Sequence, residues 1–119
     1  MIEETLTSKI KPVIDKVFPG KAAKSETGPF VVYIRATTSR ETDISGPAGI
    51  SYPVFQLNIY DTSYKNMALL SDQLRFALDG WKQDAVLYCS VEDDFDFAAD
   101  PDEDGFYCRV MRLKLTHRE

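Results

Sequence analysis

The chain has 119 residues, of which 44% are hydrophobic and 28% are charged, and this composition is typical of one folded domain spanning residues 1–119. Its 14 Lys and Arg against 19 Asp and Glu leave a net charge of -5, which disfavours nucleic acid as a partner. No stretch approaches the roughly 20 apolar residues of a membrane span, and the opening MIEETLTSK has acids where a signal peptide has bases, so we expect a cytoplasmic protein without membrane contact.

The first predicted element is an amphipathic helix at the start of the chain. Apolar residues recur on one helical face from Ile2 to Val17. Pro12 should kink or interrupt this helix, and the sequence Phe18-Pro19-Gly20 should end it. A strand should follow from Phe30 to Thr38, because this run alternates and is rich in β-branched and aromatic residues.

The polar stretch Ser39–Gly49 predicts a long loop between two strands of a hairpin. We expect its Arg40–Gly49 part to be mobile in an isolated subunit and to become ordered on assembly. Pro53 should lie near the start of the second strand, because proline donates no ladder hydrogen bond. The inward face of that strand should carry Phe55, Leu57 and Ile59.

A second helix should begin after Asp61–Ser63, which offers capping side chains, and end at Gly80. Leu69 and Phe76 lie seven residues apart on the opposite side of this helix from its main stripe, which indicates a second apolar face for a partner. The alternative is that Phe76 packs on Trp81 at the helix end and Leu69 is simply exposed. The main apolar stripe comprises Met67, Leu70, Leu74, Ala77, Leu78 and Trp81.

Two further strands should form a second hairpin. Residues 85–91 place Leu87, Cys89 and Val91 on one side, and residues 106–117 form the last strand. The apolar face of the last strand switches between Val110 and Met111, as a β-bulge would cause. The order α-β-β-α-β-β predicts a single α+β domain whose antiparallel sheet is covered by both helices on one face.

The segment Glu92–Asp104 is the strongest charge feature, because it contains eight acids and no base. The remainder of the chain has 11 acids against 14 bases. An acidic lobe could orient a subunit in an assembly or repel DNA from a channel, and a merely solvated loop is an equally good interpretation. Its candidate residues are Asp93, Asp94, Asp96, Asp100, Asp102, Glu103 and Asp104.

The sequence offers only weak candidates for catalytic or metal-binding residues. The sequence from Asp100 to Gly105 matches the first half of a calcium-binding EF-hand loop, but the twelfth position is Met111 where an acid is needed. Cys89 occupies an inward strand position, and the only histidine, His117, lies near the end of the chain. Two cysteines are too few for a disulfide framework, so both should be reduced. We therefore expect no catalytic residue, metal or cofactor.

Four segments that span most of the chain resemble a family of small bacteriophage tail completion proteins. They are VFPGKA, GPFVVYIRATTS, GPAGISYPVFQLNIYDTSYKNMALLSDQLRFALDG and CRVMRLKLTHRE. The resemblance lies in the order and spacing of short motifs, here Pro19-Gly20, Gly46-Pro47-Ala48-Gly49, Tyr60-Asp61 and Leu78-Asp79-Gly80. The acidic segment matches no motif of that family.

The resemblance implies a non-enzymatic tail terminator or tail-to-head joining protein, made in the host bacterial cytoplasm and located in the virion at the head-tail junction. Its expected partners are further copies of itself in a ring, most simply a hexamer, together with the tail tube protein and the head-tail connector protein. The subunit-interface candidates are Leu69, Phe76, Gly46, Pro47 and Gly49. The alternative is an α+β domain that binds a small ligand or a metal, possibly as an enzyme.

Overall fold

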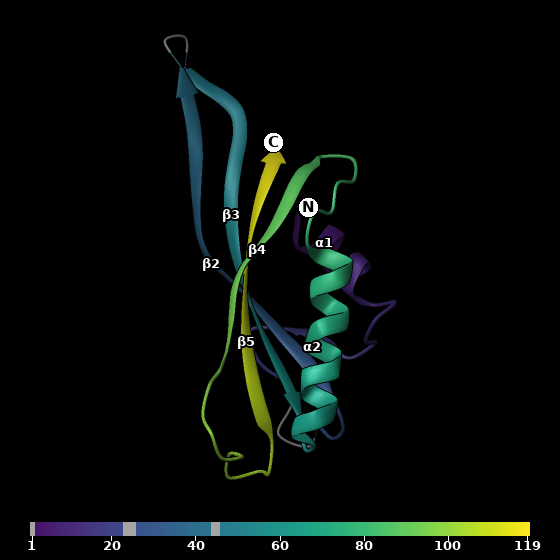
Figure 1. Cartoon of the computed structure of the whole chain (residues 1–119). Helices are drawn as coiled ribbons and strands as arrows, with labels where there is room; N and C mark the ends of the chain where they lie inside the picture. The colour runs from purple at the N-terminus through teal and green to yellow at the C-terminus, as the bar shows by residue number, and fades with distance from the viewer. Residues whose placement is uncertain (1, 23–25, 44–45) are drawn as a thin grey trace.

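The structure is a computed structural model that describes residues 2–22, 26–43 and 46–119. Its strands form one five-stranded sheet in the order β1-β2-β3-β5-β4, and both helices lie on the same face of this sheet (Figure 1). The prediction of an α+β fold with helices on one face is confirmed. The elements are α1 (Ile2–Ile10), β1 (Val17–Pro19), β2 (Phe30–Asp43), β3 (Gly46–Asp61), α2 (Tyr64–Leu78), β4 (Val86–Asp96) and β5 (Tyr107–Arg118).

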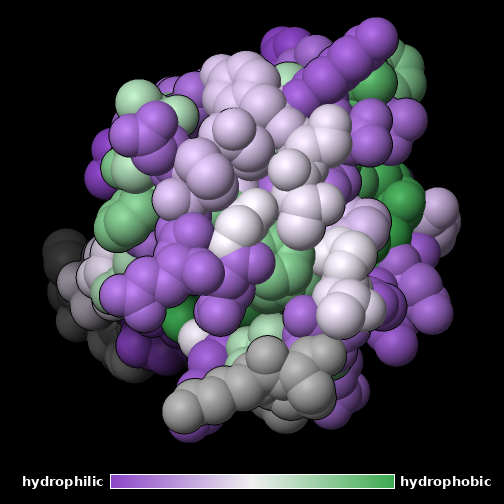
Figure 2. Space-filling view, turned by 90° about the horizontal axis from the view of Figure 1, so that it is seen from below, coloured by the Kyte–Doolittle hydropathy of each residue, from purple (hydrophilic) through white to green (hydrophobic). Residues whose placement is uncertain are grey.

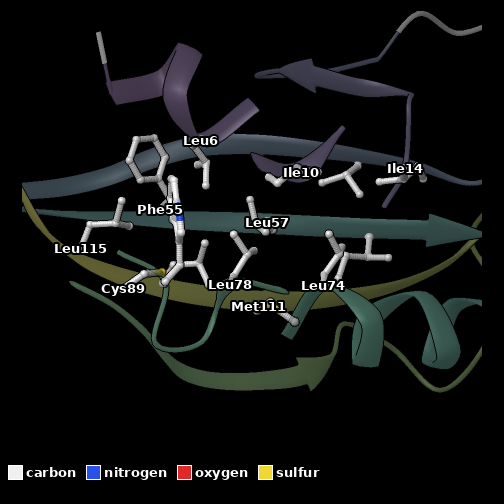
Figure 3. Packing of buried hydrophobic residues seen from close by; sticks show 14 of the residues in the cluster. Leu6, Ile10, Ile14, Phe55, Leu57, Leu74, Leu78, Cys89, Met111 and Leu115 are labelled. Atoms are coloured by element: carbon white, nitrogen blue, oxygen red, sulfur yellow. The ribbon is translucent and has the colours of Figure 1, made fainter. Parts of the chain in front are cut away.

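The hydrophobic core lies between the two helices and the sheet. Leu6 and Ile10 of α1 point toward Leu57 of β3, and Leu74 and Met111 continue the same layer (Figure 3). Each large apolar side chain that is fully buried stabilises the fold by roughly 1.5 to 3 kcal/mol. The side chains with 0% exposure include Leu6, Ile10, Phe55, Leu57, Ile59, Met67, Leu74, Leu78, Cys89, Met111, Leu113 and Leu115.

The second helix is the element that the sequence predicted best. Ser63 is its N-cap, and the Ser63 side chain accepts a hydrogen bond from the Asn66 backbone N–H. Asp79 caps the other end, and Gly80 follows with a φ of 79°. Asp61 accepts a further hydrogen bond from the Ser63 backbone N–H, so the turn before the helix is also fixed.

The N-terminal helix ends at Ile10, which confirms the predicted interruption at Pro12, but the apolar pattern does not continue as a helix to Val17. The backbone N–H groups of Val13 and Ile14 both bond to the Ile10 carbonyl, which closes the helix in a turn around Pro12. The chain then forms β1, which pairs with β2 in parallel. The prediction of a purely antiparallel sheet in the order α-β-β-α-β-β is wrong in this respect, since β1 adds a parallel edge strand.

The predicted polar loop at 39–49 is mostly strand. β2 continues to Asp43 and β3 begins at Gly46, so the two strands form a long ribbon that projects beyond the rest of the sheet (Figure 1). This ribbon gives the molecule its long axis of 53 Å. Pro53 consequently lies inside β3, and the β3–β5 pairing is interrupted at Tyr52 and Pro53, where proline has no N–H to donate.

In the pairing of β4 with β5 the bulges lie in β4 and not in β5, and the pairing of β2 with β3 also shifts register at two places. The pairing of β4 with β5 shifts between Val86 and Tyr88 and again between Val91 and Asp93, whereas β5 pairs with β3 in one continuous register. Leu87 is therefore the extra residue of a bulge and is only half-buried. The apolar switch in β5 arises because Val110 and Met111 lie on opposite faces of the sheet and both are buried.

Candidate assembly surfaces

An aromatic cluster covers one end of the sheet face that the helices leave free. Phe30 of β2 stacks on Tyr60 of β3 with ring centroids 4.8 Å apart, and Phe106 meets the Phe30 ring edge-on at 5.2 Å. Phe18 contacts Phe30 from the other side at 6.2 Å. Because these rings come from four separate segments, they join β1, the start of β2, the end of β3 and the loop between β4 and β5.

A groove of about 410 Å³ lies beside this cluster, and we call it the aromatic groove. The loop between β4 and β5 forms one wall, and the floor is made by β3 and β5. Figure 2 views this end of the molecule and shows hydrophobic residues in the centre with hydrophilic residues around them. Phe97 at the edge of the groove is 75% exposed. The lining residues are Asn58, Tyr60, Phe97, Ala98, Asp100, Pro101, Asp102, Phe106 and Cys108.

The loop that walls the groove is held in shape by Asp102. Its Oδ1 accepts hydrogen bonds from the backbone N–H groups of Asp104 and Phe106, and its own N–H donates to the Phe106 carbonyl. Gly105, with a φ of 84°, completes the turn in a conformation that favours glycine. The apparent EF-hand sequence is thus an Asx-type turn. In the described part of the chain no group of three or more His, Cys, Asp or Glu side chains could hold a metal ion.

The predicted acidic lobe divides into two parts. Asp93 and Asp96 lie in β4 and pair with Arg112 and Arg109, and Asp96 also accepts a hydrogen bond from the Tyr64 hydroxyl. Hydrogen bonds from these arginines lower the pKa of both carboxyls. The other six acids pair with no cation in the described residues. They are Glu92, Asp94, Asp100, Asp102, Glu103 and Asp104.

The second apolar face of α2 is solvent-exposed in the monomer. Leu69 is 52% exposed and Phe76 is 92% exposed. Trp81 is buried and belongs to the core. The alternative in which Phe76 packs on Trp81 is therefore wrong, because a side chain that covers another ring cannot be almost fully exposed.

The remaining interface candidates lie at the far end of the ribbon, away from α2 (Figure 1). Backbone pairing places Gly46 and Pro47 in β3 opposite Asp43 and Thr42. Gly49 is exposed and has a φ of 78°. The candidates that the sequence analysis grouped together thus occupy two separate places.

The thiols and the histidine do not form a reactive pair. Cys89 is fully buried, and this burial raises the pKa of its thiol to about 12, so it stays protonated. Burial also raises the pKa of Cys108, which lines the aromatic groove. His117 is half-buried, with its Nδ1 3.5 Å from the Ser51 hydroxyl oxygen. The arrangement therefore provides no activated nucleophile at Cys89.

Sequence reasoning missed the aromatic cluster beside the groove. The signal was the run Phe30-Val31-Val32, which is apolar on both faces of β2 where a strand with one solvated face should alternate. Both Phe30 and Val32 are buried on the face opposite Val31.

The comparisons with known proteins concern the fold. No family model matches this sequence, and no curated protein matches it. The structure is similar to a chain in a solved structure described as the virion of a native gene transfer agent particle, with a TM-score of 0.74 and 7% sequence identity. The match covers 96% of this chain and 92% of that chain, so the two share one fold along nearly their whole lengths. None of the described helices is long and apolar enough to cross a membrane.

Proposed function

We propose that this chain is a structural protein of a phage-like virion, and more specifically a tail terminator or tail completion subunit at the head-tail junction. The observation that carries this proposal is the shared fold with a chain of a gene transfer agent virion, which extends over nearly all of both chains. The tail-completion motifs in the sequence support the finer assignment. In this role the chain is non-enzymatic, and its partners are further copies in a ring, the tail tube and the connector.

The exposed face of α2 is the surface that we assign to contact with a neighbouring subunit. A ring repeats one head-to-tail contact, so a small apolar patch is buried once in every junction. Leu69 and Phe76 suit this role because they are large, apolar and exposed in the monomer. A contact with a neighbouring subunit would remove Phe76, which is 92% exposed in the monomer, from water.

The second candidate function is binding of a small ligand, and the aromatic groove favours it. Its volume of about 410 Å³ is within the range of ligand sites, and it combines aromatic walls with the Asp100 carboxylate. A thermal-shift screen of small aromatic amines tests this candidate. Concentration-dependent stabilisation that Ala98→Trp abolishes would favour ligand binding over a purely structural role.

The experiment for the proposed function uses particles whose gene for this chain is deleted and supplied in trans. Electron microscopy should show separate heads and tails without the protein and joined particles with the wild-type protein. The variant with Leu69→Lys and Phe76→Ser should fold but leave heads and tails separate. Lys11→Gln, at an exposed position outside α2, is the control and should restore joining. Normally joined particles in the absence of the protein would overturn the proposal.

A further inference from the structure

The free face of the sheet carries a second feature, at the opposite end from the aromatic groove. Lys114 of β5 lies over the Tyr52 ring with its Nζ 5.5 Å from the ring centroid, and Lys82 lies over Tyr88 at 5.9 Å. Arg118 ends β5 beyond them. We call these five residues the basic tyrosine patch.

The cations of this patch have no carboxylate partner in the described part of the chain. The ion pairs among the described residues involve neither Lys82 nor Lys114 nor Arg118. Of the two glutamates close to the patch, Glu41 accepts a hydrogen bond from the Tyr52 hydroxyl within the patch, and Glu119 pairs with Arg40. The patch therefore presents positive charge together with Tyr88, which is 45% exposed.

The aromatic groove has the complementary character. Its rim belongs to the segment in which six carboxylates lack a cation partner among the described residues, and Asp100 lies directly in its lining. Its exposed aromatic ring, Phe97, offers a π-face to a lysine or to a tyrosine ring. Opposite charges and matching aromatic surfaces favour contact between the two features.

The positions of the two features decide what kind of contact they can make. The groove lies where β5 begins, and the patch lies toward the end of β5 near the C-terminus (Figure 1). A single copy cannot bring them together, because the sheet holds them apart. The two surfaces do not overlap, so one copy can use both at once with two different neighbours. This geometry is that of a head-to-tail contact.

We propose that the aromatic groove of one copy binds the basic tyrosine patch of the next copy. The inference rests on the proposed function, since it adds a second junction between subunits of the same ring and names the surfaces that meet. It is separate from the α2 face, which contains none of these residues.

Sedimentation velocity tests the contact with the full chain and charge-reversed variants. The first variant, Lys82→Glu with Lys114→Glu, reverses the patch. The second variant, Asp100→Lys with Asp104→Lys, reverses the groove rim and leaves Asp102 to hold the loop. Circular dichroism should show that both variants are folded. Lys11→Glu changes an exposed lysine outside both the patch and α2 and is the control.

The wild-type chain and the control should associate beyond the dimer as concentration rises toward about 1 mM, and added salt should weaken this association. Each reversed variant alone should associate much less than the wild type, because its groove and its patch then carry the same sign and only the α2 face remains. An equimolar mixture of the two variants should associate again, since every groove in the mixture meets a patch of opposite sign.

Three results would overturn the inference: a wild-type chain that stays monomeric or stops at a dimer up to about 1 mM, variants that associate as the wild type does, or a mixture that stays monomeric. None of these three results tests the proposed function, which is measured by head-tail joining in particles and depends on Leu69 and Phe76. Conversely, particles that join without the protein would remove the proposed function and leave the measured contact intact.

Discussion

Polar substitutions on the two faces of α2 should have opposite effects on folding, and this contrast tests which face of the helix packs in the core. Leu70 is 8% exposed and packs in the core. Leu70→Lys loses roughly 1.5 to 3 kcal/mol of apolar burial and adds the cost of a charge held near apolar groups, together on the order of 5 kcal/mol. Small domains are stable by only about 5 to 15 kcal/mol, so this variant should be largely unfolded. Leu74→Lys, with no exposed surface at all, should be at least as damaging.

The double variant with Leu69→Lys and Phe76→Ser should behave differently. Both side chains already face water, and substitutions at exposed positions usually change the free energy of unfolding by about 0.5 kcal/mol or less each. Urea unfolding followed by far-UV circular dichroism should give a midpoint close to that of the wild type. If the double variant unfolds as readily as Leu70→Lys, then Leu69 and Phe76 belong to the core and the assignment of the α2 face is wrong.

Four further predictions concern the acidic loop, calcium, the thiols and the pH dependence of stability. Asp102→Ala should lower the free energy of unfolding by about 0.5 to 1.5 kcal/mol, because two solvent-exposed backbone N–H groups exchange their carboxylate acceptor for water. The melting temperature of the wild type should be the same in millimolar calcium as in millimolar magnesium. A rise of several degrees with calcium alone would show that the loop binds calcium. Cys89 should react with a thiol reagent only after unfolding, since it is fully buried with a pKa of about 12, whereas rapid labelling of both cysteines in the folded protein would contradict this. The hydrogen bond from Arg109 lowers the pKa of Asp96 in the folded state, so this carboxylate contributes stability above its unfolded pKa and loses it as pH falls through the folded pKa. Asp96→Asn should therefore destabilise at about pH 7 and converge with the wild type in acid, and a constant difference between the two urea midpoints at all pH values would refute this origin.

The sequence predicted elements whose signals are local. The Ser63 cap, the apolar stripe and Gly80 all lie within α2 or next to it, so they could be recognised together. β1 has no such signal, because three residues are too short for a period and its stability comes from pairing with Val31–Tyr33. The apolar residues that precede β1 continue the helical period past Pro12. The sequence pattern therefore predicted a helix where β1 forms.

The ribbon formed by the ends of β2 and β3 was mistaken for a loop for a physical reason. A two-stranded ribbon outside the sheet has solvent on both faces, so neither face needs apolar residues and the alternation disappears. The composition of Ser39–Gly49 is therefore equally compatible with a loop and with an exposed ribbon. Only the cross-strand pairs, such as Ser39 with Tyr52, distinguish them.

The aromatic groove could not be assembled from the sequence, because its residues come from β3, β5 and the loop between β4 and β5. The composition of the sequence revealed the acidic segment. Which of its acids form ion pairs, however, depends on the pairing of β4 with β5. That pairing brings Asp93 next to Arg112 and Asp96 next to Arg109, and it leaves the loop acids without such partners.

The ribbon also revises the expectation of a mobile segment at Arg40–Gly49. Beyond Gly49, whose carbonyl accepts a hydrogen bond from the Glu119 N–H, the described residues of the two strands pair only with one another, and two strands alone are marginally stable in water. The side-chain hydrogen bonds of this region, Arg40 with Glu119 and Tyr52 with Glu41, are solvent-exposed and contribute little. We therefore expect the amide hydrogens of residues 40–42 to exchange rapidly in the isolated subunit.

A neighbour that covers the ribbon in an assembled particle would supply the missing contacts, and amide exchange there should slow in the particle. Hydrogen exchange read by mass spectrometry measures both states, with the amides of Leu57 and Ile59 in the buried part of β3 as the slow reference. Equal protection of residues 40–42 in the free subunit and in the particle would show that the ribbon is already stable by itself. In that case assembly would not explain the length of the ribbon, because the isolated subunit would already order it.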